Sequence, residues 1–212
     1  GIKGMTTNEE DFVENMVNMN THDYLLFFSN RGKVYKIKGY EVPTFSRQSK
    51  GLPIVNLLPL EKDEVIKVML KVTTEEENKY VVFCTQKGLI KRTNISEFNN
   101  IRSNGKIAIT LKDDDEIIDV RITDGNSDVI LVTKTGLSIR FHEQEARPVG
   151  RTSMGVKGIT LGKDDHVIGM EPIVSEKDNY ILAITENGFG KRTEVEEYRS
   201  QSRAGKGILT YK

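Results

Sequence analysis

Lysine and arginine recur in this chain at fixed places relative to glycine turns. Gly32, Gly88, Gly136 and Gly188 stand roughly 50 residues apart, and the segment after each of them carries Lys or Arg. A second glycine turn follows in each repeat, at 49–51, 103–105, 156–158 and 205–207, and Lys or Arg lies in or beside it. Cations that recur at equal spacing can neutralise successive phosphates of a nucleic-acid backbone. The residue pattern therefore points to phosphate binding by a repeated surface.

The candidate phosphate-binding set consists of the cations in and beside these two kinds of turn. Segment 147–158 is the most basic connector between strands. The formal net charge of +0 is compatible with such a set, because a neutral total can hide charges gathered on one face. The candidates are Arg31, Lys33, Lys36, Lys38, Arg47, Lys50, Lys87, Lys91, Arg92, Arg102, Lys106, Lys134, Arg140, Arg147, Arg151, Lys157, Lys191, Arg192, Arg199, Arg203 and Lys206.

Other kinds of site have little support in the sequence. His22, His142 and His166 are scattered and never pair at the spacing of metal ligands, so no metal site is predicted. The acidic run 113–116 does not match a calcium loop and is interpreted as a structural turn. The lone Cys84 excludes an internal disulfide and is expected to be a small buried hydrophobe. No residue is predicted to be catalytic.

The candidate cations depend on β-hairpins for their positions. In the last repeat, the apolar segment 180–185 precedes an Asn-Gly pair, which is typical of a two-residue hairpin turn. Lys191 and Arg192 are adjacent in the returning strand, so at least one cation is expected to face solvent or a sheet edge. After the second glycine turn, the chain is expected to form another strand, as at 52–58 and 208–211.

Three landmarks recur in constant order: an acidic turn, a hairpin and the second glycine turn. They indicate about four copies of one all-β unit, each of about four strands, and hence a propeller-like array. The chain is predicted to be a single domain, 1–212, because the blades of an array share their cores. The approximate blades are 1–60, 61–112, 113–162 and 163–212.

Several motifs also carry a family resemblance. They are GKVY at 32–35, YEVP at 40–43, KGLP at 50–53 and GFGKRT at 188–193. Together they resemble the C-terminal domain of bacterial DNA gyrase A, over essentially the whole chain. That family folds as a β-pinwheel, in which neighbouring blades of a propeller-like disc exchange strands. The resemblance implies about four blades here, as part of a six-bladed array.

The family's signature is the heptapeptide Gln-Arg-Arg-Gly-Gly-Lys-Gly on the first blade. Gly1 resembles its final glycine, so the heptapeptide is expected just upstream of this sequence. A degenerate copy stands in the last unit, and its matching residues are Gln201, Arg203, Gly205, Lys206 and Gly207. Ser202 and Ala204 depart from the pattern, so this copy is interpreted as an ordinary DNA-contacting turn.

The resemblance implies a function in DNA wrapping. A domain of this kind bends double-stranded DNA around a basic rim, with weak sequence preference, and presents a segment for negative supercoiling. The implied partners are the N-terminal cleavage domain of gyrase A and the gyrase B protein, in the bacterial cytoplasm with the nucleoid. ATP and Mg belong to the holoenzyme, so neither a cofactor nor catalysis is expected here. The sequence contains no run of about 18 apolar residues, so it predicts no membrane span.

Three alternatives stay open at the level of sequence. The closest is the equivalent DNA-binding domain of topoisomerase IV. A protein-interaction propeller would instead present an apolar patch, for which Tyr35, Tyr40, Phe45 and Phe141 are the candidates. A propeller enzyme would need convergent carboxylates or a metal at its central channel, and the sequence indicates neither.

Overall fold

A computed structural model describes residues 18–44, 54–73, 76–173, 180–184 and 189–209 of the chain. Its strands are β1 (Tyr24–Ser29), β2 (Lys33–Lys38), β3 (Ile66–Val72), β4 (Tyr80–Thr85), β5 (Leu89–Asn94), β6 (Lys106–Ile107), β7 (Ile117–Thr123), β8 (Asp128–Thr133), β9 (Leu137–His142), β10 (Val156–Lys157), β11 (Val167–Ile173), β12 (Tyr180–Ile184), β13 (Gly190–Glu194) and β14 (Ile208–Leu209). Five 3-10 turns connect them, namely η1 (Gly39–Glu41), η2 (Ile54–Leu57), η3 (Ile95–Phe98), η4 (Glu143–Glu145) and η5 (Val195–Glu197).

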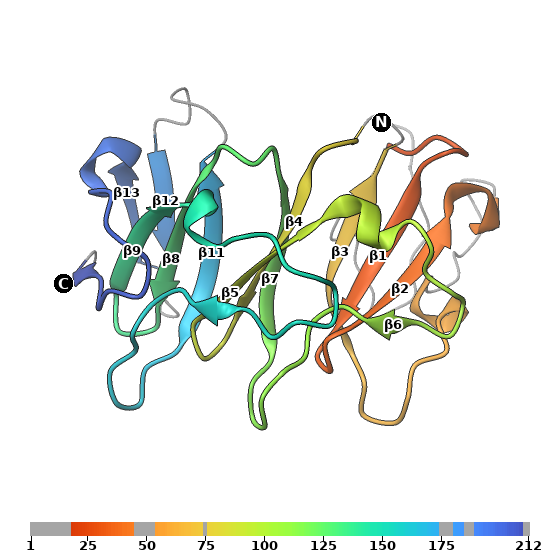
Figure 1. Cartoon of the computed structure of the whole chain (residues 1–212), viewed down its shortest axis with the longest axis horizontal. Helices are drawn as coiled ribbons and strands as arrows, with labels where there is room; N and C mark the ends of the chain where they lie inside the picture. The colour runs from red at the N-terminus through yellow and green to blue at the C-terminus, as the bar shows by residue number, and fades with distance from the viewer. Residues whose placement is uncertain (1–17, 45–53, 74–75, 174–179, 185–188, 210–212) are drawn as a thin grey trace.

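The strands form antiparallel sheets that stand side by side along the long axis of the molecule (Figure 1). Three sheets have four strands each, in the orders β3-β1-β2-β6, β7-β4-β5-β10 and β11-β8-β9-β14. In a fourth sheet, the structure describes β12 and β13. The predicted all-β fold of repeated four-stranded blades is therefore confirmed.

Each four-stranded sheet is built from more than one repeat. Its two middle strands are a hairpin, and its inner strand follows the acidic turn that comes after that hairpin. Its short outer strand follows the second glycine turn of the following repeat. The first sheet, for example, takes β6 from a segment that the sequence assigned to the second unit, 61–112. This is the strand exchange that the resemblance implied, and it ties successive sheets together covalently. The unit boundaries themselves stay a prediction.

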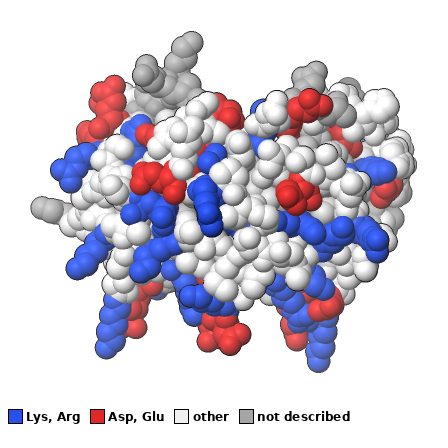
Figure 2. All heavy atoms as spheres, viewed as in Figure 1, with Lys and Arg blue, Asp and Glu red and all other residues white. Residues whose placement is uncertain are grey.

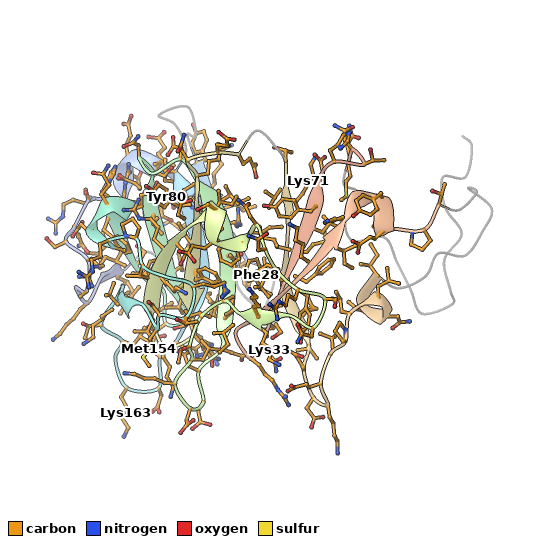
Figure 3. The ribbon with its side chains drawn as sticks, turned by 45° about the vertical axis from the view of Figure 1, so that its right-hand side comes forward. Phe28, Lys33, Lys71, Tyr80, Met154 and Lys163 are labelled. Atoms are coloured by element: carbon orange, nitrogen blue, oxygen red, sulfur yellow. The ribbon has the colours of Figure 1, made fainter. Side chains whose placement is uncertain are left out.

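The core lies between adjacent sheets. The inner strands β3, β7 and β11 pack against one another. Phe28 of the first sheet meets Phe83 of the second edge to face, with ring centroids 5.3 Å apart, and both rings pack on Phe98. Figure 3 shows Phe28 in the interior of the molecule. Apolar strand residues thus bind the sheets into one body, because no sheet can bury its apolar face alone.

The acidic turns are structural, as predicted. Asp63, Asp114 and Asp164 adopt φ values of 63°, 62° and 59°, a left-handed conformation that Asp tolerates better than most residues. The carboxylate that follows then docks on a neighbouring hairpin. Oδ1 of Asp115 accepts a hydrogen bond of 3.0 Å from the backbone N–H of Lys87, which fixes the end of that hairpin.

Two predicted strands differ from the structure. Residues 54–57, expected within a strand, form the 3-10 turn η2. Pro53 and Pro59 flank this turn, and proline cannot donate to a sheet ladder, so pairing is disfavoured on both sides. The predicted strand 208–211 is described only at Ile208–Leu209. Predictions for 1–17, Arg47, Lys50 and the Asn187-Gly188 turn lie outside the described residues.

Candidate nucleic-acid interface

The outer strands β6, β10 and β14 define a rim on the side of the sheets away from the packed inner strands. Each follows a connector that begins after a 3-10 turn. We refer to residues 99–107, 146–157 and 198–209, which include these strands, as the rim connectors. In Figure 1 the second of them crosses in front of β7.

The rim connectors carry only positive charge. They contain eight cations and no Asp or Glu, although the whole chain has 31 residues of each sign. Figure 2 shows Lys and Arg across the middle of this face, with a few acidic residues among them, and acidic residues beside basic ones at its lower tips. The eight cations are Arg102, Lys106, Arg147, Arg151, Lys157, Arg199, Arg203 and Lys206.

Hydrogen bonds join the rim connectors into a continuous surface. The Thr110 hydroxyl, just after the first connector, donates to the carbonyl of Thr152 in the second at 2.7 Å. The Thr160 hydroxyl repeats this bond to Ala204 in the third at 2.6 Å. The sequence analysis missed these two threonines. Their signal is an Ile-Thr pair at the same distance from a glycine turn in both repeats.

The glycines of the rim connectors correct one alignment of the repeats. Gly105, Gly155 and Gly207 adopt φ values of 77°, 94° and 77° and directly precede the outer strands. The counterpart in the third repeat is therefore Gly155, not Gly158 as the sequence suggested. A side chain at Gly155 would also collide with the chain, because its Cβ would lie 2.7 Å from the carbonyl oxygen of Ile90.

Several predicted cations are accessible. In the described part of the chain, their side chains make no ion pair or hydrogen bond. Lys106 is half-buried and the others are exposed. Two of them, Lys38 and Lys134, lie off the rim connectors. The set is Lys38, Arg102, Lys106, Lys134, Arg147, Lys157, Arg199 and Lys206.

Three predicted cations are engaged by the acidic turns. Arg31 forms an ion pair with Glu61, and Lys33 shares the same carboxylate at 3.0 Å. The hydrogen bond from Lys33 and the nearby positive charges lower the pKa of Glu61. Lys87 donates to the backbone carbonyl of Asp113 at 2.9 Å. These contacts are exposed, so they compete with phosphate only weakly.

Lys91 and Arg92 are buried, which contradicts their place among the predicted phosphate-binding cations. Lys91 is 1% exposed and donates to the carbonyls of Ala108 and Arg151. Arg92 is 5% exposed, donates through Nε to the carbonyl of Ala146 at 2.9 Å, and lies 3.6 Å from the Glu143 carboxylate. Neither side chain can reach a DNA phosphate, so both leave the candidate set.

Lys36, Arg92 and Arg140 form a series of ties between sheets. Each stands four residues after the hairpin glycine and binds a carbonyl in or just after the 3-10 turn of the next sheet. Lys36 donates to Asn99 at 2.9 Å, and Arg140 donates to Val195 at 2.9 Å. Lys36 and Arg140 are therefore also structural rather than free to bind DNA. The sequence showed the repeat of these cations but not their partners, which are 54 to 63 residues away.

Comparison with known proteins identifies the family of this repeat. The family model described as DNA gyrase C-terminal domain, beta-propeller, matches residues 23–70, 79–124, 127–173 and 179–212. The chain belongs to this family. The matched segments each contain a hairpin, and the first three also contain most or all of the inner strand that follows it, so the repeat of the DNA gyrase C-terminal domain coincides with the sheets.

The chain is 54% identical over 211 residues to the DNA gyrase A protein of Staphylococcus epidermidis, and 51% identical to that of Staphylococcus aureus. It spans about a quarter of the length of these relatives, because the alignment covers 99% of the chain and 24% of the relative. Among solved structures, it is similar to the C-terminal domain of DNA topoisomerase IV, with a TM-score of 0.87, 31% identity and coverage of 98% of this chain and 64% of that one. The DNA gyrase A C-terminal domain gives a TM-score of 0.74, 26% identity and coverage of 98% and 69%.

The box-like segment of this gyrase-type domain is mostly used inside the fold. The backbone N–H of Gln201 donates to the carbonyl of Arg140 at 2.7 Å, and Nε of Arg203 donates to the carbonyl of Glu145 at 3.2 Å. Ala204, where the family heptapeptide has glycine, adopts a φ of 71°. Gly205 and Gly207 are partly buried. Arg203 is also partly buried, so Lys206 is the exposed cation of the motif.

In the last hairpin, Lys191 and Arg192 are both exposed, and Arg192 lies 4.4 Å from the centre of the Tyr180 ring. Lys191 also lines a cavity of about 90 Å³ between β9 and β13. Both residues stay in the candidate set. Arg47 and Lys50 stay predictions, because they lie outside the described residues.

The structure also bears on the other kinds of site. Tyr35 and Phe141 are buried, which removes two members of the proposed apolar patch, while Tyr40 is 65% exposed. Cys84 is buried as expected, and burial raises the pKa of its thiol. Among the described residues, no His, Cys, Asp and Glu side chains are grouped as metal ligands, and no helix is long and apolar enough to span a membrane.

Proposed function

We propose that this chain binds double-stranded DNA along its rim connectors through the phosphate backbone. The observation that carries the proposal is the charge of these connectors: eight cations, no acid, and hydrogen bonds that join the three segments into one surface. A duplex carries one negative charge about every 1.7 Å of its axis, so a continuous basic strip gains affinity by releasing counterions.

The same surface favours a bent duplex. Successive sheets are tied by Lys36, Arg92 and Arg140 and by the aromatic core. The rim of a propeller-like array of such sheets would be curved. Bending 20–30 base pairs by 40–90° costs on the order of 1–6 kcal/mol, which several phosphate contacts per sheet can offset. The described elements include strands and 3-10 turns of three or four residues but no recognition helix, which supports weak sequence preference.

In the longer protein, this domain would wrap DNA beside the cleavage domain of the same polypeptide. The wrapped segment would be presented for strand passage, so that the holoenzyme introduces negative supercoils with ATP hydrolysed, in the presence of Mg, by the gyrase B protein. The name of the relatives, DNA gyrase A, supports this role. The chain itself would supply binding and bending and no catalytic group, in the bacterial cytoplasm.

The test is binding to duplexes of increasing length across a salt series, with a fluorescence measurement of bending. The triple variant Arg102→Gln, Arg147→Gln, Arg199→Gln should reduce the slope of log affinity against log salt by about 2.7, because each phosphate contact contributes about 0.9. Equal loss of slope in a matched triple variant at the acidic turns would contradict binding along the rim. That control changes Lys62, Lys112 and Lys163 to Gln, and Figure 3 shows Lys163 at the lower tip of the molecule.

A further inference from the structure

The rim has a seam between its first two connectors where two cations lie together. Arg151 belongs to the second connector, and Lys91 lies beneath it on β5. The Lys91 ammonium donates to the carbonyl of Arg151 and to the carbonyl of Ala108, which directly follows the first connector. Lys91 thereby fixes the backbone of Arg151 and holds both sides of the seam.

Two nitrogens of the Arg151 guanidinium lack acceptors among the described residues. Its Nε and Nη1 atoms are buried and have no hydrogen-bond partner in the described part of the chain. Other rim or tie arginines differ: Arg140 and Arg203 donate to carbonyls, and Arg92 also pairs with Glu143. Buried donors without acceptors are unfavourable, so turning the Arg151 side chain outward would relieve that cost without breaking a hydrogen bond.

The charge at the seam is not balanced. Burial, together with the neighbouring Arg151 charge, lowers the pKa of Lys91 to about 7, while Glu97 acts weakly in the opposite direction. The Phe83 ring, whose centre lies 5.2 Å from Nζ, is the other group that faces the ammonium. Neither connector beside the seam contains an acidic residue.

We propose that this seam is a phosphate-binding notch, in which Arg151 turns outward to hold a DNA phosphate above Lys91. The inference rests on the proposed DNA binding and assigns one of its contacts. A phosphate accepts two parallel hydrogen bonds from a guanidinium, which satisfies donors that are now orphaned. Its negative charge also favours the charged form of the amine below.

The notch predicts that DNA binding is coupled to proton uptake. Burial lowers the pKa of Lys91 in the DNA-free chain, and a phosphate above it favours the ammonium form, so a fraction of a proton should be taken up from buffer near pH 7.5. Calorimetric titration of a duplex into the chain, in two buffers of different ionisation enthalpy, measures that number.

The decisive variants are Arg151→Gln and, as the matched control, Arg147→Gln, which removes an exposed cation of the same connector. Arg151→Gln should weaken binding about tenfold and abolish proton uptake, because a charge-assisted bidentate contact is lost. Arg147→Gln should weaken binding less and keep the uptake. Equal effects of the two variants, or no uptake by the unaltered chain, would overturn the notch while leaving rim binding in place. If the unaltered chain does not bind duplex DNA at low salt, the proposed function and the notch both fall.

Discussion

The sequence Lys-Arg-Thr occurs twice, at 91–93 and 191–193, and the two copies occupy different environments. In the first copy, Lys91 and Arg92 are 1% and 5% exposed and bind carbonyls outside their own hairpin. In the second copy, both cations are exposed. One local feature is shared: Arg92 and Arg192 each lie 4.4 Å from the centre of a tyrosine ring, Tyr80 or Tyr180. The local sequence thus places the arginine against the tyrosine ring in both hairpins. The other contacts of the arginine depend on the neighbouring sheet.

The difference follows from what covers each hairpin. The second sheet has β7 on one side and β10 on the other, and the turn η4 packs close to Arg92. In the described residues, β12 and β13 pair only with each other. Equivalent apolar positions show the same contrast, because Val82 on β4 is 1% exposed and Leu182 on β12 is 64% exposed. A cation in this motif is therefore structural where neighbouring strands and turns cover the hairpin, and accessible where they do not.

The largest test of this contrast is removal of the arginine. Arg92→Met should lower the free energy of unfolding by about 3–5 kcal/mol, because it leaves the Glu143 carboxylate, only 1% exposed, without its cation. Arg192→Met should change it by no more than about 1 kcal/mol, because its contact with the Tyr180 ring is exposed. Urea denaturation of both variants gives the comparison. Adding Glu143→Gln to Arg92→Met should restore part of the lost stability. A similar loss of stability in both arginine variants would show that coverage by the neighbouring sheet does not decide their roles.

The sequence was sufficient for the parts of the fold that depend on local residues. Glycine and acidic turns marked the hairpins, and their spacing predicted the blades and the basic connectors. It was insufficient for Lys91, Arg92 and Arg140, because their burial or pairing depends on carbonyls 17 to 60 residues away, in or beside the 3-10 turns and rim connectors. Alternation along a strand predicts which way a side chain points but not whether another repeat covers that face.

The next test uses pH. The pKa of Lys91 is lowered to about 7 in the folded chain, against about 10.4 for an unfolded lysine. Between these values the unfolded state binds a proton that the folded state does not, so stability should rise by about 1–2 kcal/mol from pH 7 to 8.5. Below pH 6 this contribution should be constant. Above about pH 8.5 the unfolded thiol of Cys84 also titrates and acts in the opposite direction.

Denaturation across that pH range should therefore separate the two lysines. Lys91→Met should remove the rise, and Lys191→Met should keep it. Because Lys91→Met also takes donors from two carbonyls, direct titration of the Lys91 side chain by NMR in the unaltered chain provides an independent value. A midpoint near the ordinary lysine value of about 10.4 would refute the assignment of a desolvated ammonium.

The accessible copy should contribute to DNA binding and not to stability. Arg192→Gln should reduce the salt slope of duplex binding by about 0.9, with a loss of affinity below about 1 kcal/mol at moderate salt. Its matched control is Lys163→Gln, which removes an exposed cation at an acidic turn and should leave the slope unchanged. If Arg192→Gln behaves like the control, exposure in this hairpin does not indicate a phosphate contact.

The smallest expected effect concerns the feature that the two copies share. A double-mutant cycle of Tyr180→Leu with Arg192→Gln, measured by urea denaturation, should give a coupling of about 0.5–1 kcal/mol in the free energy of unfolding. This is the strength of an exposed cation–π contact. The corresponding cycle at Tyr80 and Arg92 should give about 2 kcal/mol or more, because that guanidinium is desolvated. Both pairs have the same 4.4 Å separation, so geometry alone predicts equal couplings. A larger coupling in the covered pair would therefore measure the effect of the neighbouring sheet on an otherwise identical contact.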